Sequence, residues 1–398
     1  MSHAVVPPEG SIPVAVSLGH VARGPHRVTV EPVAGFSPAA IDPDPVFTLT
    51  EVADLASVVL RHAPILYGRT RGVPGGPYQN VHTDVPLLAW HEERPMGPHR
   101  VLEYSVLWSH EDGGTDGPTL MARWGRTTDI EWVYRVRVDH RGRRVAGSAE
   151  YQGPGHVARA FAGRYEHDHP LLQVCTPNNM VSDRVEGVLR FAVAADTPVL
   201  RGRAREAMME LHPWTRRVAA GEVAAEGLTE PRSTARSPTL GHPRQYLYLE
   251  LATHRHPATS RPAGLAFGIR VAGDPTVYRS DHGLPDRSIT RSGPVSTAVK
   301  LPTGSTLADV DQVMAIRVPT PGASDTIVVD GVTRGFLLTK TLAPGPALSG
   351  RGRRAVLTPH RAWAVVWSRE LEPAPASGPG ERLCGVVGPG RWERARAG

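Results

Sequence analysis

Two segments of this chain alternate apolar and polar residues with the period of a β-strand. They are "HRVLEYSVLWS" (residues 99–109) and "DIEWVYRVRVD" (residues 129–139). Successive side chains of a strand point to opposite faces, so each segment predicts a strand with one buried face. The residues expected on the buried faces are Leu102, Tyr104, Val106, Trp108, Ile130, Trp132, Tyr134, Val136 and Val138. Such strands fold as an antiparallel sheet that covers a core on one side.

The rest of the chain supports a fold that is mainly β. Gly and Pro number 41 and 38 of 398 residues, which favours short strands joined by turns. Helical patterns occur in residues 47–63 and 197–226, whereas "TLMARWG" (residues 119–125) reads as a short strand. We therefore predict a mainly β fold with helical insertions, in which a β-sandwich is followed by a second, smaller β domain.

A chain of 398 residues is long enough for two domains, each with its own core. Residues 1–46 are Pro-rich and aperiodic, and we expect them to be an N-terminal extension. Residues 47–240 are predicted to form the β-sandwich domain with helices and the candidate active site. Residues 241–398, which contain strand patterns without a long helix, are predicted to form the second β domain.

The charge pattern gives little support for nucleic-acid binding. Of 45 basic residues only Lys300 and Lys340 are lysines, and the arginines are spread among 39 acids. This bias is typical of a high-GC bacterial coding sequence, and a nucleic-acid site would need clustered basic residues with aromatics between them.

No apolar run approaches the roughly 20 residues of a membrane span, and no signal peptide is visible, so we expect a cytoplasmic protein, with secretion left open. Cys175 and Cys384 have no neighbouring cysteine to form a zinc site, and one long-range disulfide remains possible in principle. The sequence leaves the oligomeric state open.

Polar residues gather around the start of the second alternating segment. Asp129 and Glu131 share one face of the predicted strand, opposite its apolar face and together with Arg135 and Arg137. They are either site residues covered by another layer or members of exposed ion pairs, each contributing less than about 1 kcal/mol. His110 begins the preceding loop, and we name it with these two acids as a candidate catalytic group.

The same loop, "HEDGGTD" (residues 110–116), contains further acids. Oxygen-rich clusters suit Ca²⁺, Mg²⁺ or Mn²⁺, so Asp116, Asp129 and Glu131 are candidate ligands of a divalent cation. Asp and Gly are also ordinary turn residues. The candidates for substrate binding are Trp108, Arg126, Asn178 and Asn179.

Histidines form two more candidate groups. His167 and His169 flank Asp168, and His156 precedes them in a Gly-rich turn. Such residues can act as metal ligands or as acid and base, although a polar loop before a strand explains them equally simply.

Two stretches resemble known families. "LASVVLRHAPILYG" followed by "TDVPLLAWHE" resembles the opening of the family named after the yeast vacuolar protein sorting protein sixty-two. An aromatic-rich strand, a polar loop and then an acid-x-acid pair resemble that family and the necrosis-inducing proteins, in which "GHRHDWE" and an upstream Asp surround a divalent cation in a β-sandwich.

The resemblance covers residues 50 to 190 and implies metal binding by Asp129 and Glu131, with Asp116 as the upstream acid. The chain departs from the family pattern at Arg126 and Thr128, which stand where the family has histidines, and at Ile130, which replaces an aromatic residue.

Two functions remain open. The first is an enzyme of hydrolase or lyase type that acts on a small molecule or glycan, with an acidic and histidine site and a divalent cation as candidate cofactor. The second is a non-catalytic β-sandwich module that binds a glycan, a lipid or a protein. The sequence contains no P-loop, nucleophile elbow or HExxH motif, which argues against the common nucleotide, serine hydrolase and zinc enzymes.

Overall fold

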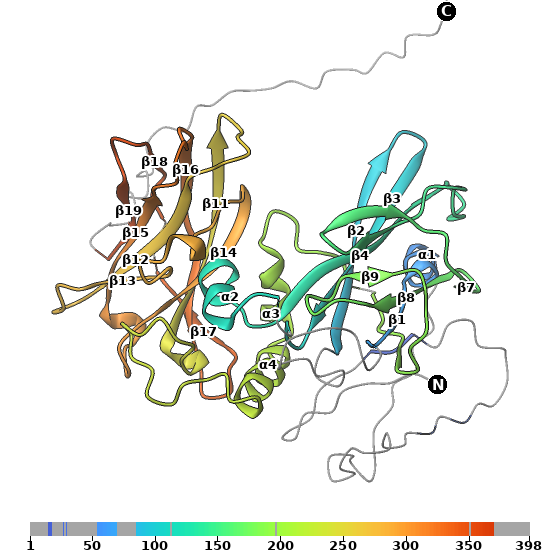
Figure 1. The fold of residues 1–398 in the computed structure, drawn as a ribbon, viewed down its shortest axis with the longest axis horizontal. Coiled ribbons are helices and arrows are strands. Elements are labelled where there is room, and N and C mark those ends of the chain that lie inside the picture. The colour runs from blue at the N-terminus through green and yellow to red at the C-terminus, as the bar shows by residue number, and fades with distance from the viewer. Residues whose placement is uncertain are drawn as a thin grey trace, which may run out of the picture.

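The computed structural model describes residues 15–17, 27, 29, 54–69, 85–111, 114–195, 197–349 and 352–369. Strands dominate these residues and form four sheets with few helices, which confirms the predicted mainly β fold with helical insertions. Figure 1 shows the strands in two bodies, with the N-terminal strands in one and the C-terminal strands in the other. Most of the predicted N-terminal extension and Cys384 lie outside the described residues.

The first body contains a five-stranded antiparallel meander. Its strands follow one another in the sheet in chain order. They are β2 (Pro86–Met96), β3 (His99–Trp108), β4 (Asp129–Val138), β5 (Glu150–Gly153) and β6 (Val157–Ala160). The two alternating segments therefore form the neighbouring strands β3 and β4, as their pattern predicts.

A smaller second sheet faces this meander. Its strands are β1 (Ile65–Tyr67), β7 (Tyr165–Glu166), β8 (His169–Val174), β9 (Val181–Ser182) and β10 (Arg190–Phe191). The first of these pairs in parallel with β8 and antiparallel with β10.

Helix α1 (Asp54–His62) packs against the same core, and its carbonyl at Val59 accepts a hydrogen bond of 2.7 Å from Tyr104 Oη. The predicted helix in residues 47–63 is thus confirmed over residues 54–62, and residues 47–53 lie outside the described residues.

The second body is a sandwich of two antiparallel sheets. One sheet consists of β11 (Tyr246–His256), β14 (Gly293–Lys300), β16 (Thr326–Leu338), β17 (Pro344–Ala347) and β18 (Ala355–Leu357). The other consists of β12 (Gly264–Val271), β13 (Val277–Arg279), β15 (Val310–Val318) and β19 (Trp363–Ser368). Apolar residues of both sheets, among them Leu249, Phe267 and Val313, form one core. Single 3-10 turns lie between strands at Pro285–Arg287 and Leu307–Asp309, and another at Pro243–Gln245 leads into β11.

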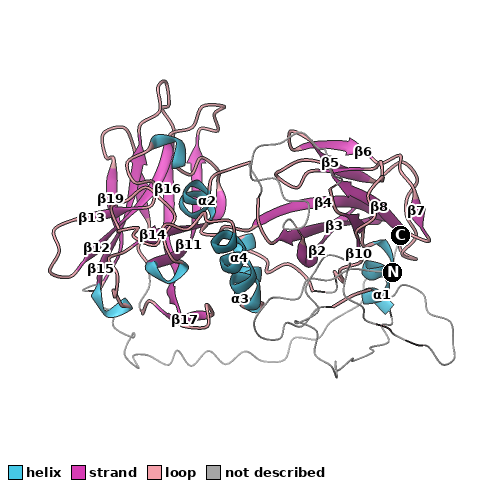
Figure 2. Cartoon of the chain, turned by 60° about the horizontal axis from the view of Figure 1, so that its bottom comes forward, coloured by secondary structure: helices cyan, strands magenta, loops and turns pink. Residues whose placement is uncertain are grey.

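Helices lie between the two bodies (Figure 2). They are α2 (Gly117–Trp124), α3 (Met208–Leu211) and α4 (Trp214–Ala225), with a 3-10 turn at Arg205–Ala207. The helical pattern of residues 197–226 is confirmed from residue 205 to residue 225, with α3 and α4 separated at Pro213. Residues 197–204 are not helical. No helix of the described residues is both long and apolar enough to cross a membrane.

The strand predicted at residues 119–125 is wrong, because this segment belongs to α2. Asp116 caps the helix by accepting a hydrogen bond of 2.6 Å from the Thr119 amide, and a proline stands in the first turn. Gly125 ends it in the left-handed conformation with φ of 65°. The helix packs on β14 of the second body, where Thr297 Oγ1 donates a hydrogen bond of 2.6 Å to the Ala122 carbonyl.

An ion network also joins the bodies. Arg203 donates to both carboxylate oxygens of Glu250 on β11, at 2.7 and 2.8 Å from Nε, and to Glu210 of α3 at 3.0 Å. Residues assigned by the sequence to the first domain therefore contact the second body directly. The predicted boundary at residue 240 stays a prediction.

Candidate functional site

A β-bulge in β4 decides which way its first residues point. Tyr104 of β3 lies opposite Tyr134, but the next residue, Ser105, lies opposite Trp132, so Val133 is an extra residue. An extra residue in one strand reverses the alternation of side chains beyond it. The side chains of residues 129–132, which precede the bulge, therefore lie on the faces opposite to those that simple alternation predicts.

The bulge turns the two acids toward the interior. Asp129 lies opposite Trp108 and Glu131 lies opposite Val106, and directly opposite residues of an antiparallel pair share a face. Trp108 and Val106 are fully buried in the core between the two sheets. The prediction that Asp129 and Glu131 lie on the face opposite the apolar residues is therefore wrong.

The outer face of β4 has its own ion pairs. Arg135 Nε donates to Glu103 Oε2 at 2.7 Å, and its Nη1 lies 3.4 Å from Glu150 Oε2. The same guanidinium stacks on the ring of Trp132, with 4.4 Å between Cζ and the ring centroid. Arg135 thus finds its acidic partners on the neighbouring strands. Of the two alternatives that the sequence left open, its exposed pairing with the two acids of β4 is not the one found.

Asp129 is enclosed by polar groups from three segments. Its side chain is 4% exposed, and Asn179 Nδ2 donates to Oδ2 at 3.0 Å. The same amide donates to the His110 carbonyl at 3.1 Å. The other oxygen, Oδ1, lies 3.8 Å from Arg126 Nη1. Asn179 reaches this position from the turn between β8 and β9, where its φ of 54° is one that Asn tolerates.

Glu131, unlike Asp129, approaches the surface. Its side chain is 17% exposed, and Gln152 Nε2 donates to Oε2 at 3.0 Å. His156 Nδ1 lies 3.6 Å from Glu131 Oε1, and His156 Nε2 lies 3.4 Å from Asn178 Nδ2. His156 is 54% exposed, so this pair forms the solvent-facing edge of the site.

Glu111 adds a third carboxylate. It is buried, and its carboxylate occupies the space that a side chain at Gly114 would need, next to Asn178. Glycine at position 114 is therefore required for this close approach. The charge of Glu111 acts on both acids of β4, so Glu111, Asp129 and Glu131 form one electrostatic group.

Burial and mutual repulsion change the protonation of this group. Burial first, and then the charges of Glu131 and Glu111, hold the pKa of Asp129 well above its ordinary value, although Arg126 opposes the shift. Burial also raises the pKa of Glu111. The hydrogen bond to Glu131 raises the pKa of His156. The arrangement therefore favours a protonated Asp129 beside a Glu131 and His156 pair.

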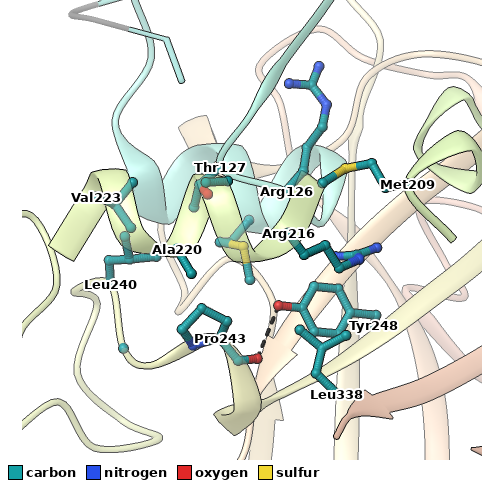
Figure 3. Close-up of a pocket in the computed structure, with 13 residues that line it drawn as sticks. Arg126, Thr127, Met209, Arg216, Ala220, Val223, Leu240, Pro243, Tyr248 and Leu338 are labelled. Atoms are coloured by element: carbon teal, nitrogen blue, oxygen red, sulfur yellow. Dashed lines mark hydrogen bonds between the residues drawn. The ribbon is translucent and has the colours of Figure 1, made fainter. Parts of the chain in front are cut away.

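Arg126 is the cation of the site, and its position is structural as well as electrostatic. It is buried, its Nε donates to Glu206 Oε1 at 3.2 Å, and its Nη1 donates to the Thr128 carbonyl. With Thr127 it also contributes to a cavity of about 20 Å³, which has room for roughly one water molecule. Figure 3 shows the guanidinium of Arg126 directed away from the other residues that line this cavity.

Asp116 does not join the three carboxylates. One of its oxygens caps α2, and the other lies 3.8 Å from Arg287 Nη2 of the second body. Its exposed side chain thus has a structural partner on each oxygen. The structure does not bring the predicted metal ligands Asp116, Asp129 and Glu131 together.

Two other predicted site residues lie deeper than expected. The imidazole of His110 is directed to the Thr127 carbonyl, 3.1 Å from Nδ1, and to Glu226, 3.9 Å from Nε2. Only the backbone carbonyl of His110 meets Asn179. Trp108 is fully buried opposite Asp129, so it forms part of the floor beneath the acids.

The remaining histidine pair does not converge on this site. His169 is buried with its Nδ1 2.8 Å from the Ala63 carbonyl, whereas His167 is exposed with φ of 55° in the turn between β7 and β8. His156 joins the site instead, and its pairing with Glu131 could not be read from the Gly-rich turn that contains it.

The residues present do not fit a divalent cation. Throughout the described residues, no three His, Cys, Asp or Glu side chains are placed to hold a metal ion together. One Asp129 oxygen already accepts from Asn179, and the other faces the positive charge of Arg126. A guanidinium beside the central carboxylate repels a cation, so we derive no chemistry through the metal that the resemblance implied.

The sequence did not point to Gln152 and Glu206 as members of this site. Gln152 holds Glu131 from β5, and Glu206 holds Arg126 from the turn before α3. Their contacts join positions 21 and 80 apart along the chain, and neither residue stands in a recognisable motif.

Searches of protein-family models, of curated proteins and of solved structures find no significant match to this chain. The resemblance to the vacuolar sorting and necrosis-inducing families therefore stays an expectation from short motifs.

Proposed function

We propose that this protein is an enzyme of hydrolase or lyase type that works by general acid–base catalysis at Asp129, Glu131 and His156. The observation that carries the proposal is the contrast between two acids on one strand. Asp129 is buried with a raised pKa, whereas Glu131 is partly exposed and paired with His156. Neighbouring acids in different environments are suited to donate and to accept a proton in the same reaction.

The hydrogen bonds suggest the role of each group. Asn179 holds Oδ2 of Asp129, which leaves Oδ1 to carry the proton toward a leaving group. Glu131, held by Gln152, is the base that activates water or removes a proton from the substrate. His156 carries a positive charge beside Glu131 at the exposed edge of the site. Arg126 limits the repulsion between the carboxylates.

Two buried acceptors favour a substrate with hydroxyl groups. Asn179 Oδ1 and Gln152 Oε1 accept no hydrogen bond from any described residue, although each amide nitrogen is used within the site. A buried acceptor without a donor is costly, and a ligand hydroxyl can supply the donor. A small polyhydroxylated molecule or a glycan meets this requirement.

The alternative is a module that binds such a ligand without chemistry. It is favoured by the open edge of the site, where His156 is exposed, and by the small size of the cavity behind Arg126. A deep pocket usually encloses a small-molecule substrate. The two functions differ in whether a bound glycan is converted.

Turnover of defined probes tests the proposal. We would assay nitrophenyl glycosides, nitrophenyl esters and uronate oligosaccharides with the wild type, Asp129→Asn and Glu131→Gln. We expect one class to be converted with a bell-shaped pH profile, and each variant to lose about 100- to 10,000-fold in kcat. Glu92→Gln is the matched control, because Glu92 is an acid on β2 of the same sheet with a side chain 40% exposed.

Two outcomes would overturn the catalytic assignment. In the first, both site variants keep wild-type turnover. In the second, calorimetry detects binding of an oligosaccharide that the wild type leaves unchanged, which would establish the binding module instead.

A further inference from the structure

Two polar side chains meet beneath the loop that joins α4 to β11, in the second body and apart from the acidic site. Lys300, the last residue of β14, places its Nζ 2.5 Å from Ser233 Oγ of this loop. The same Nζ donates to the Thr239 carbonyl at 2.5 Å. Lys300 is 1% exposed and Ser233 is 5% exposed. The amine is therefore fixed between a hydroxyl and a carbonyl.

Lys300 has no acidic partner. Among the described residues its Nζ donates to Ser233 and to the Thr239 carbonyl, and Glu230 acts on it only at longer range. A buried ammonium without a counter-ion is strongly disfavoured, whereas a neutral amine at the same place is not. The surroundings thus shift Lys300 toward the form that can accept a proton.

The choice of residue supports the same conclusion. The chain has 45 basic residues, and Lys300 and Lys340 are its only lysines. Arginine keeps its proton at every physiological pH, whereas a buried lysine can lose it. The buried position beside Ser233 is thus occupied by the basic residue that is able to act as a base.

We propose that Ser233 and Lys300 form a serine–lysine dyad for acyl transfer, with an ester or amide of a small acid as substrate. Neutral Lys300 Nζ takes the hydroxyl proton while Ser233 Oγ bonds to the carbonyl carbon. The bond to the leaving alcohol or amine breaks, and that group takes the proton from the Lys300 ammonium. Water then attacks the acyl–Ser233 ester, gives its proton to Lys300, and releases the acid as Ser233 recovers its hydroxyl proton.

The neighbouring charges support a base near neutral pH. Burial first, and then Arg287, lower the pKa of Lys300 to about 8, with Glu230 opposing them. His282 also faces this group, and burial together with Lys300 and Arg287 lowers its pKa to about 4, so its imidazole is neutral. About one Lys300 in ten is then unprotonated at pH 7.

Covalent labelling tests the dyad independently of the acidic site. We would treat the full chain with para-nitrophenyl acetate and locate the acetyl group by peptide mass mapping. We expect an ester on Ser233 that forms faster as the pH rises through about 8. Lys300→Arg retains a donor for Thr239 but cannot act as a base, so we expect it to fold and to label at least about 100-fold more slowly.

The controls separate the dyad from a structural tether. Ser237→Ala alters another serine of the same loop, and Lys340→Met removes the exposed lysine, so neither should change labelling at Ser233. Ser233→Ala should remove the adduct, with its melting curve showing that the fold is kept. The proposal is overturned if Ser233 stays unlabelled while Lys340 reacts, if Lys300→Arg labels as fast as the wild type, or if Lys300 Nζ carries the acetyl group.

Discussion

Replacement of Asp129 by asparagine should change how the stability of this protein depends on pH. The folded-state pKa of Asp129 lies above its unfolded value of about 3.9, because the site is buried and contains two more carboxylates. Between these two pKa values the native state binds more protons than the unfolded state. The free energy of unfolding must then fall as the pH rises, by up to about 1.4 kcal/mol for each pH unit.

The size of the effect follows from this slope. Across the interval between the two pKa values the wild type should lose up to about 1.4 kcal/mol of stability per pH unit through Asp129. Asparagine has nearly the same shape and no charge, so Asp129→Asn should avoid this loss. The variant should therefore become more stable relative to the wild type as the pH rises through this interval, which raises its Tm relative to that of the wild type.

Calorimetric melting at a series of pH values measures this difference. The partly exposed acid Glu92 is the control, because Glu92→Gln should follow the wild-type pH dependence. Subtraction of the wild-type curve removes the contribution of all acids that titrate equally in both proteins. If Asp129→Asn and the wild type lose stability in parallel as the pH rises above about 4, the argument that Asp129 is held in its protonated form is refuted.

Three further results are expected from other parts of the structure. Asp116→Ala should cost about 1 kcal/mol of stability by removing the cap of α2, and should leave turnover unchanged; a loss of turnover at full stability would contradict its assignment as a cap. Gly125→Ala should cost about 1 to 3 kcal/mol by thermal melting, since φ is 65° and a Cβ would lie 3.0 Å from the Thr297 backbone; an unchanged Tm would show that the helix end adapts. Addition of EDTA, Ca²⁺, Mg²⁺ or Mn²⁺ should leave the Tm unchanged. A rise in Tm with one ion in the wild type that is absent from Asp129→Asn would show that a metal ion binds at Asp129.

The sequence predicted strands β3 and β4 correctly because the alternation of side chains is a local property. It placed Asp129 and Glu131 on the wrong face because one bulged residue, Val133, interrupts that alternation. Nothing in the local pattern marks this position, since Val133 is as suitable for a regular strand as its neighbours. The bulge depends on how β4 pairs with β3, and that is a long-range property.

The error at α2 is of a different kind. Asp116, a proline in the first turn and Gly125 are ordinary signals for the start and end of a helix, and they were visible in the sequence. The segment is short and lies between two predicted strands, a setting that also suits a short strand. Recognition of the helix would also have identified Asp116 as a cap and not as a metal ligand.

The composition of the candidate site was predictable only in part. The sequence named four of its residues, Arg126, Asp129, Glu131 and Asn179, and the structure brings them together, whereas Gln152 and Glu206 were not named. The contact between Ser233 and Lys300 joins residues 67 positions apart that belong to no common motif. Pairs of this kind depend on the packing of a loop against a sheet, which periodicity does not reveal.

The measurement that tests the central claim most directly is the infrared difference spectrum between the wild type and Asp129→Asn, recorded in steps upward from about pH 5, where a free aspartate is already ionised. The account predicts the carbonyl stretch of a protonated carboxyl group in the wild type, absent from the variant and lost from the wild type when the pH rises above the pKa of Asp129. A difference spectrum that contains only ionised carboxylate bands from about pH 5 upward would contradict the assignment of Asp129 as the proton donor.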